Sequence, residues 1–238
     1  MARSGRYFLA DQPLHVIQRG VDRQAVFFRP DDYARYRDWL IAAAREYGCA
    51  VHAYVFMTNH VHLLVTPAKA DSLPRTMQSL GRRYVRYVNG SHKRTGTMWE
   101  GRYRAAPVDS DAYFLACCRY VELNPVRARM VAHPRDYAWS SFRAHADGEK
   151  DPLLSDHPLY RRLGRTAAER QQEYRSLFRA KLADDFVEAL RAATNGGWAL
   201  GDDRFKRQIA KMAGRRATPL PKGRPPADRK DKRQLNLL

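Results

Sequence analysis

A pair of histidines, His60 and His62, stands one residue apart at the start of an apolar run. In a β-strand, alternate side chains point to the same face, so the two imidazoles would project side by side. Paired imidazoles are a common way to hold a divalent metal. Histidines in strands also pack in cores with satisfied hydrogen bonds, so the pair alone leaves both interpretations open.

Further candidate ligands lie near residue 120. Asn124 follows Tyr120 by four residues on an expected helix, which places both side chains on one helix face. Glu122 points elsewhere, and we expect it in a surface or salt-bridge role. Cys117 and Cys118 are adjacent on the same helix and point about 100° apart, so they fit better as small core residues.

Two imidazoles and one side-chain oxygen would leave open positions on a bound metal ion. Those positions can take phosphate oxygens, polarise the phosphorus and neutralise developing charge. A tyrosine on the adjoining helix could then attack, helped by the metal because a phenol pKa is usually about 10. The product would be a covalent phosphotyrosine, which a free hydroxyl can reverse without ATP. The chain has 13 tyrosines, so composition does not single out Tyr120.

The elements expected around these residues follow the order β-α-β-β-α-β-α. Strands are predicted over residues 14–19, 50–57, 60–66 and near 99–108, with the turn Thr58-Asn59 joining the second to the third. Helices are predicted from Arg29-Pro30 to Gly48, over 71–89 with Ser72 as a cap, and from Ser110 or Asp111 to about Leu123. Antiparallel pairing with helical crossovers predicts an α+β fold, with a ferredoxin-like antiparallel sheet and helices on one or both faces.

The chain changes character after about residue 148. We predict a first domain over residues 1–148, an α-helical C-terminal extension over 149–213 and a flexible basic tail over 214–238. Helical patterns in the extension cover 166–182, 184–193 and 202–213. The tail has four prolines and eight Lys or Arg against two Asp, which contributes +6 to the net charge. It is expected either to contact phosphates or to be a solvated terminus.

The net charge of +18 in 238 residues favours a polyanionic partner, nucleic acid first and a membrane surface second. Solubility alone is the simpler explanation. The sequence contains no run of 18 apolar residues, which a transmembrane helix would need, and no secretory signal. We therefore expect no membrane association. Three cysteines without a C-x-x-C spacing indicate reduced thiols, and hence a cytoplasmic protein, associated with the nucleoid if it binds DNA.

Basic side chains concentrate on the second predicted helix, in the loop after it, and before the helix that carries Tyr120. The candidates for DNA contacts are Arg82, Arg83, Arg86, Lys93, Arg94, Arg102 and Arg104. Trp99 and Tyr103 alternate with them and could stack on unpaired bases; the other interpretation places Trp99 in the core and leaves the arginines to solvate a helix. Trp139 is expected to anchor the packing at the end of the first domain.

The motif R-Y-V-E-L-N-P-V-R-A, residues 119–128, resembles the signature of the REP-associated tyrosine transposases, bacterial IS200-like members of the single-tyrosine HUH transposase superfamily. Similar segments occur in the expected order: V-I-Q-R-G-V-D-R-Q-A-V-F-F, Y-V-F-M-T-N-H-V-H-L-L-V, M-W-E-G-R-Y-R, Y-A-W-S-S-F, L-G-D-D-R-F and K-G-R-P. The resemblance spans nearly the whole chain, and the histidine motif followed at this separation by the tyrosine motif is specific.

The resemblance implies roles that the spacing did not assign. It makes Tyr120 the nucleophile, His60 and His62 the metal ligands, and Mg²⁺ or Mn²⁺ the ion. Insertion-sequence relatives carry a glutamine as third ligand four residues after the tyrosine. Here that position is Asn124, whose side chain is shorter.

The resemblance also implies a transposase-type endonuclease and strand transferase. It would cleave and rejoin single-stranded, hairpin-bearing (REP-like) DNA through a 5′-phosphotyrosine, as a monomer or a homodimer. The alternative is a non-catalytic, domesticated protein that binds DNA hairpins, although the key residues are intact. A third interpretation is an RNA-binding regulator on the same scaffold, but no RNP-type aromatic motif is present.

Overall fold

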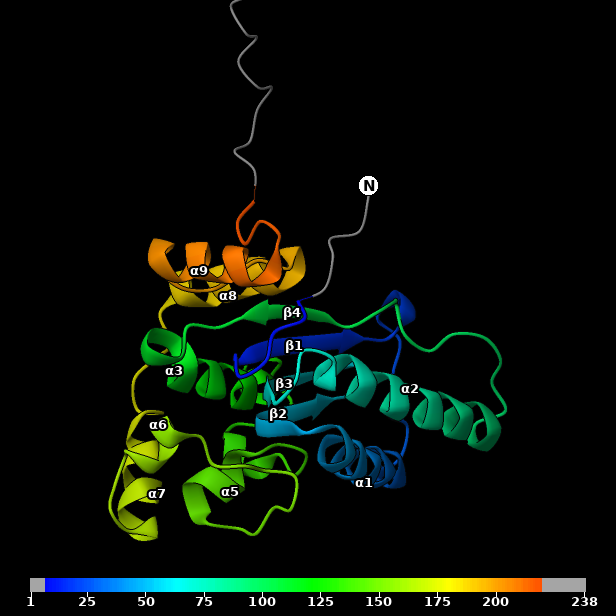
Figure 1. Cartoon of the computed structure of the whole chain (residues 1–238). Coiled ribbons are helices and arrows are strands. Elements are labelled where there is room, and N and C mark those ends of the chain that lie inside the picture. Colours follow the sequence, from blue (N-terminus) through cyan, green and yellow to red (C-terminus); the bar gives the residue numbers. More distant parts are fainter. Residues whose placement is uncertain (1–6, 220–238) are drawn as a thin grey trace, which may run out of the picture.

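A four-stranded antiparallel sheet lies at the centre of the molecule (Figure 1), in a computed structural model that describes residues 7–219. The strand order is β2-β3-β1-β4, where the bounds are β1 (Leu14–Arg19), β2 (Cys49–Met57), β3 (His60–Pro67) and β4 (Arg104–Pro107). Every neighbouring pair in this order is antiparallel. The order of elements and the pairing confirm the predicted α+β, ferredoxin-like fold.

Helices α1 (Pro30–Tyr47) and α2 (Ser72–Ser91) cover one face of the sheet. Helix α1 begins with Pro30 in its first turn and ends at Gly48, whose φ of 68° is the left-handed conformation that glycine adopts without strain. Tyr54 and Phe56 of β2 pack on this side, whereas the residues that alternate with them, such as Val55, pack on the other side. Burial on both faces explains why this strand is a continuous apolar run.

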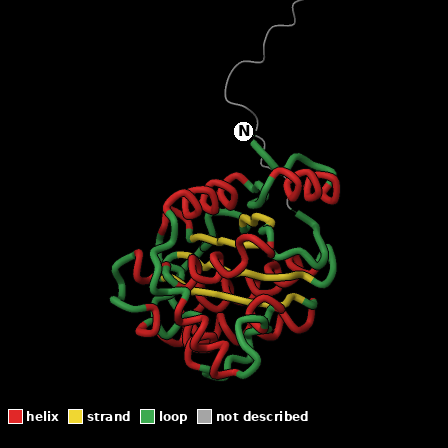
Figure 2. Tube along the Cα trace, turned by 90° about the vertical axis from the view of Figure 1, so that its left-hand side faces the viewer, coloured by secondary structure: helices red, strands yellow, loops and turns green. Residues whose placement is uncertain are grey.

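The other face is covered by α3 and by helices from the C-terminal half of the chain, so Figure 2 shows helices on both sides of the strands. The bounds are α3 (Ser110–Glu122), α4 (Asn124–Arg127), α5 (Phe142–Asp147), α6 (Pro158–Arg161), α7 (Ala167–Ser176), α8 (Asp184–Gly196) and α9 (Asp203–Ala213). Tyr174 of α7 and Leu190 of α8 are fully buried in the same cluster as Val55 of β2. The C-terminal helices therefore share a core with the sheet.

Two predicted helix features are wrong. Ser72 does not cap α2: it lies within the first turn, and its hydroxyl accepts the backbone N–H of Lys69 at 3.0 Å. The helix predicted over 166–182 begins as expected, with Thr166 and Glu169 in a capping box, but ends at Ser176. The chain then tightens into i→i+3 turns, which bring Phe178 against Phe142.

Other features agree with the sequence analysis or lie outside the described residues. Trp139 packs against both core clusters and stacks on Tyr33, with ring centroids 4.8 Å apart, as predicted for an anchor. None of the helices between residues 7 and 219 is long and apolar enough to cross a membrane. From residue 220 onward, the predicted basic tail lies outside the described residues.

Candidate active site

His60, His62, Tyr120 and Asn124 line a single pocket of about 340 Å³. The histidines come from the start of β3, where His60 pairs with the last residue of β1, and Tyr120 lies in the last turn of α3. The ring centroids of the two histidines are 5.0 Å apart, and those of His62 and Tyr120 are 5.8 Å apart. The fold thus brings together residues that are far apart in the sequence.

Both histidines are electrically neutral at pH 7. Burial, helped by the nearby Arg19 and Arg127 guanidinium groups, lowers the pKa of His62 well below its usual value. Burial and the nearby Arg19 guanidinium lower the pKa of His60 to about 4. A neutral imidazole has a lone pair, and this is the form that binds a metal.

Hydrogen bonds at Nδ1 leave Nε2 as the free nitrogen of each ring. Asn59 Nδ2 donates to the carbonyl of Arg23 at 2.9 Å, which sets the orientation of that amide. Asn59 Oδ1 then accepts from His60 Nδ1 at 2.6 Å, so the proton of His60 is on Nδ1 and its lone pair is on Nε2. In His62, Nδ1 contacts His15 Nε2 at 2.9 Å.

Asn124 has its amide oxygen available. Its Nδ2 donates to the backbone carbonyls of Tyr120 at 2.8 Å and of Val121 at 3.2 Å. Only the NH₂ group can donate to a carbonyl, so the amide orientation is determined and Oδ1 is the atom left to coordinate or accept. The same two bonds satisfy carbonyls at the end of α3, next to the tyrosine.

These donors fit a divalent ion. Within residues 7–219, no group of three or more His, Cys, Asp and Glu side chains is placed to hold a metal. An ion in this pocket would therefore depend on two imidazole nitrogens and one amide oxygen, from His60, His62 and Asn124. That mixed set suits Mn²⁺ better than Mg²⁺, which prefers oxygen ligands.

The pocket also contains side chains that the sequence analysis missed: His15, Arg19, Arg127, Arg191, Thr194 and Asn195. The guanidinium carbon of Arg127 lies 4.8 Å from the centroid of the Tyr120 ring. Three arginines around one pocket can hold the oxygens of a phosphodiester by charge-assisted hydrogen bonds. Arg127 follows Tyr120 by seven residues, or two helical turns, and this spacing could have predicted that the two side chains lie on the same side. No local pattern marks the pocket residues of α8.

The arginines and the lysine predicted to contact DNA lie outside the pocket. Arg82, Arg83 and Arg86 are exposed on α2. In the following loop, Lys93 is exposed and Arg94 is half-buried. Arg102 is exposed just before β4, and Arg104 is exposed at its first position. Arg104 approaches the pocket most directly, because it donates to Asn195 Oδ1 at 3.2 Å.

The aromatic residues predicted to stack on bases are in the core instead. Trp99 and Tyr103 are 8% and 6% exposed, and Trp99 packs on Tyr84 with ring centroids 6.2 Å apart. Their alternation with arginines reflects a segment with one buried side. An exposed aromatic side chain beside the loop after α2 is Phe28, which is 41% exposed and has the Arg94 guanidinium 5.4 Å from its ring centroid.

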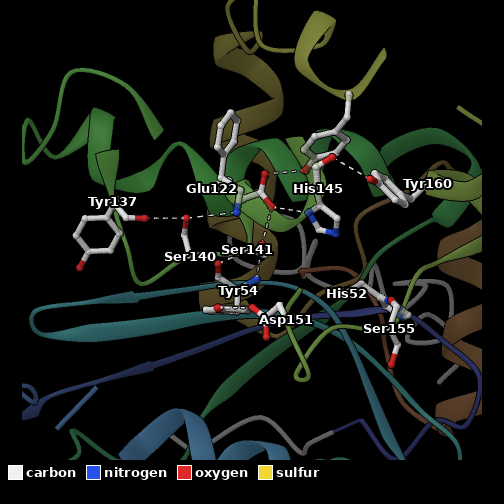
Figure 3. Close-up of polar contacts among 12 residues, drawn as sticks. His52, Tyr54, Glu122, Tyr137, Ser140, Ser141, His145, Asp151, Ser155 and Tyr160 are labelled. Carbon is white, nitrogen blue, oxygen red and sulfur yellow. Dashed lines mark hydrogen bonds and ion pairs between the residues drawn. The ribbon is translucent and has the colours of Figure 1, made fainter. Parts of the chain in front are cut away.

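One of the two predictions for Glu122 placed it at the surface. That prediction is wrong, because the side chain is fully buried. Its carboxylate accepts hydrogen bonds from Ser141 Oγ at 2.5 Å and His145 Nδ1 at 2.8 Å (Figure 3). It also accepts one from Tyr174 Oη at 2.7 Å. Its pairing with His145 agrees with the predicted salt-bridge role. This network ties the end of α3, two residues after Tyr120, to α5 and α7. Cys117 and Cys118 are buried, as predicted for core residues.

Comparisons with known proteins found a matching family model and similar solved structures. Residues 9–124 match the family model described as "Transposase IS200 like". A structure of the REP-associated tyrosine transposase bound to a REP hairpin is similar, with a TM-score of 0.54 and 16% identity, over 66% of this chain and 93% of that one. A protein from Deinococcus radiodurans described as a transposase has a TM-score of 0.36 and 21% identity, over 50% and 94%. The search of curated proteins found no match.

Proposed function

We propose that this protein cleaves and rejoins single-stranded, hairpin-forming DNA with Tyr120 as the nucleophile, in keeping with the match of residues 9–124 to the IS200-like transposase model. The observation that carries the proposal is the single pocket, in which a neutral histidine pair, a tyrosine, an amide oxygen and three arginines meet. A protein that only binds DNA hairpins would not need a tyrosine beside two neutral histidines, and Tyr120 and His62 are each only 3% exposed.

In the proposed reaction, Tyr120 Oη attacks the phosphorus of a phosphodiester and loses its proton to solvent. The bond from phosphorus to the 3′ oxygen breaks, and that oxygen takes up a proton and leaves as a free hydroxyl. The DNA on the other side stays attached as a 5′-phosphotyrosine. In the reverse direction, a 3′-hydroxyl attacks this linkage, restores the phosphodiester and releases Tyr120, so no ATP is needed.

The other pocket residues bind and orient the phosphate. Arg19, Arg127 and Arg191 line the pocket and are placed to hold its non-bridging oxygens. His60, His62 and Asn124 would hold Mn²⁺ or Mg²⁺, which when bound neutralises charge on the phosphate and polarises the phosphorus.

The direct test is a covalent adduct on denaturing gels. We expect the full-length protein, incubated with Mn²⁺ and a hairpin-bearing single-stranded oligonucleotide, to retain a label placed at the 3′ end of the DNA. A label at the 5′ end should leave with the released fragment, because the enzyme keeps the 5′ phosphate. EDTA should prevent adduct formation, and blunt duplex DNA should give none. Binding of the hairpin without any adduct would contradict the proposal and support the non-catalytic alternative.

We also propose that the exposed arginines of α2 bind the DNA backbone. Changing Arg82, Arg83 and Arg86 together to Gln should weaken hairpin binding and reduce the slope of log K against log salt by about 2, since each phosphate contact on a single strand contributes about 0.7. A matched control changes Arg161, Arg162 and Arg165 to Gln, which removes the same charge from the exposed surface around α6. Equal slopes for the two variants would show that only net charge matters.

A further inference from the structure

Buried hydrogen bonds connect the C-terminal helix α8 to His62. His15 of β1 lies between them: its Nδ1 is 2.7 Å from Thr194 Oγ1 and its Nε2 is 2.9 Å from His62 Nδ1. The three side chains are only 1–3% exposed. The planes of the two imidazoles differ by 9°, and their centroids are 5.1 Å apart. The centroid distance exceeds the distance between the two hydrogen-bonded nitrogens by about two ring radii. The rings therefore meet edge to edge, in a near-linear hydrogen bond.

The direction of these hydrogen bonds follows from the hydroxyl at one end. Thr194 Oγ1 donates its only proton to the carbonyl of Leu190 at 2.8 Å, so towards His15 it can only accept. His15 is only 1% exposed, where an unpaired charge would be costly, so its ring is neutral and has a single N–H, on Nδ1, facing the Thr194 hydroxyl. Its Nε2 must then accept from His62 Nδ1–H. With its proton on Nδ1, His62 has its lone pair on Nε2.

We propose that Thr194 and His15 are positioning residues, which hold His62 in the tautomer that presents Nε2 to the divalent ion of the pocket. The inference rests on the proposed function, because it takes His62 to be a metal ligand. Partners of this kind set the tautomer and orientation of a ligating histidine, and their loss commonly weakens metal binding 10- to 100-fold.

The two histidines are therefore supported from different parts of the chain. His60 depends on its neighbour Asn59, in the β2–β3 turn. His62 depends on a residue of α8, whose contact with His15 spans 179 positions. Residues 9–124, which match the transposase family, end well before α8. The C-terminal extension thus completes the surroundings of the metal site and does more than cover the sheet.

Nitrogen-15 NMR of the metal-free protein tests the tautomer directly. In the wild type we expect protonated Nδ1 and unprotonated Nε2 in both His15 and His62. Thr194→Val keeps the side-chain shape but removes the acceptor, so we expect mixed tautomers and at least about tenfold weaker Mn²⁺ binding by calorimetry. Thr194→Ser should restore most of the affinity. Thr76→Val is the matched control, since Thr76 is buried on α2 and makes the same bond to the carbonyl four residues before it, 2.8 Å away.

The outcomes separate this inference from the proposed function. A proton on Nε2 of His62 in a wild-type protein that binds Mn²⁺ would overturn the positioning role alone. So would a Thr194→Val variant that binds Mn²⁺ as tightly as the wild type. The expected tautomers in a wild-type protein that binds no Mn²⁺ would overturn the metal site itself, and the positioning role with it. The wild-type spectrum decides the tautomer even if the valine variant fails to fold.

Discussion

Replacing Tyr120 with phenylalanine should abolish the covalent adduct and slow DNA cleavage at least ~10³-fold, because the variant has no oxygen to attack the phosphorus. Hairpin binding should remain. The phenyl ring can keep the edge-to-face contacts that Tyr120 makes with His15 and His62, at centroid distances of 5.6 and 5.8 Å. The Tyr120 hydroxyl has no hydrogen bond to any residue in the range 7–219, so its removal leaves no buried partner unsatisfied. Single-turnover cleavage of 3′-labelled DNA measures the effect.

Tyr113→Phe provides the matched control for this experiment. Tyr113 lies on the same helix two turns earlier, stacks on Phe186 and does not line the pocket. Its variant should form the adduct at the wild-type rate. An adduct formed by Tyr120→Phe would show that another tyrosine is the nucleophile, and unchanged cleavage without an adduct would point to a hydrolytic reaction.

The central elements were predictable because their signals are local. Gly48 and the turn Thr58-Asn59 separate α1, β2 and β3, and the structure places these boundaries within one or two residues of the predicted ones. Short helices such as α5 were missed, because six residues contain too few helical turns to show a periodicity. The end of α7 was also missed, since it depends on the contact of Phe178 with a residue on another helix.

The site was predictable only where its residues are neighbours in the sequence. Two histidines on one strand face, and an asparagine one helical turn after a tyrosine, can be recognised from spacing. His15 could be placed beside His62 only after the register of β1 against β3 was known. Thr194 required the docking of α8 as well. Long-range packing of this kind has no counterpart in local periodicity.

The second large effect is expected at Glu122. Changing it to Ala should lower the free energy of unfolding by about 3–5 kcal/mol, the usual cost of removing one partner of a buried charged network. His145 and Tyr174 would lose their acceptor inside the core, and Ser141 would keep only its longer contact with the carbonyl of Tyr54, at 3.3 Å. Burial and the charge of Glu122 hold the pKa of Tyr174 well above its usual value, so this phenol always has a proton to donate. Chemical denaturation, or a fall in Tm on the order of 10 °C, measures the loss.

Two further variants separate this network from a general effect of removing a carboxylate. Glu122→Gln keeps the size of the side chain and one acceptor oxygen, but turns an NH₂ group towards a donor, so its cost should fall between that of the alanine variant and zero. Glu46→Ala, on the exposed side of α1, should change stability by less than about 0.5 kcal/mol. A Glu122→Ala protein within about 1 kcal/mol of the wild type would mean that water or rearranged partners satisfy the three donors. Because Glu122 lies two residues after Tyr120, the folded glutamine variant should also form the adduct more slowly while binding DNA normally.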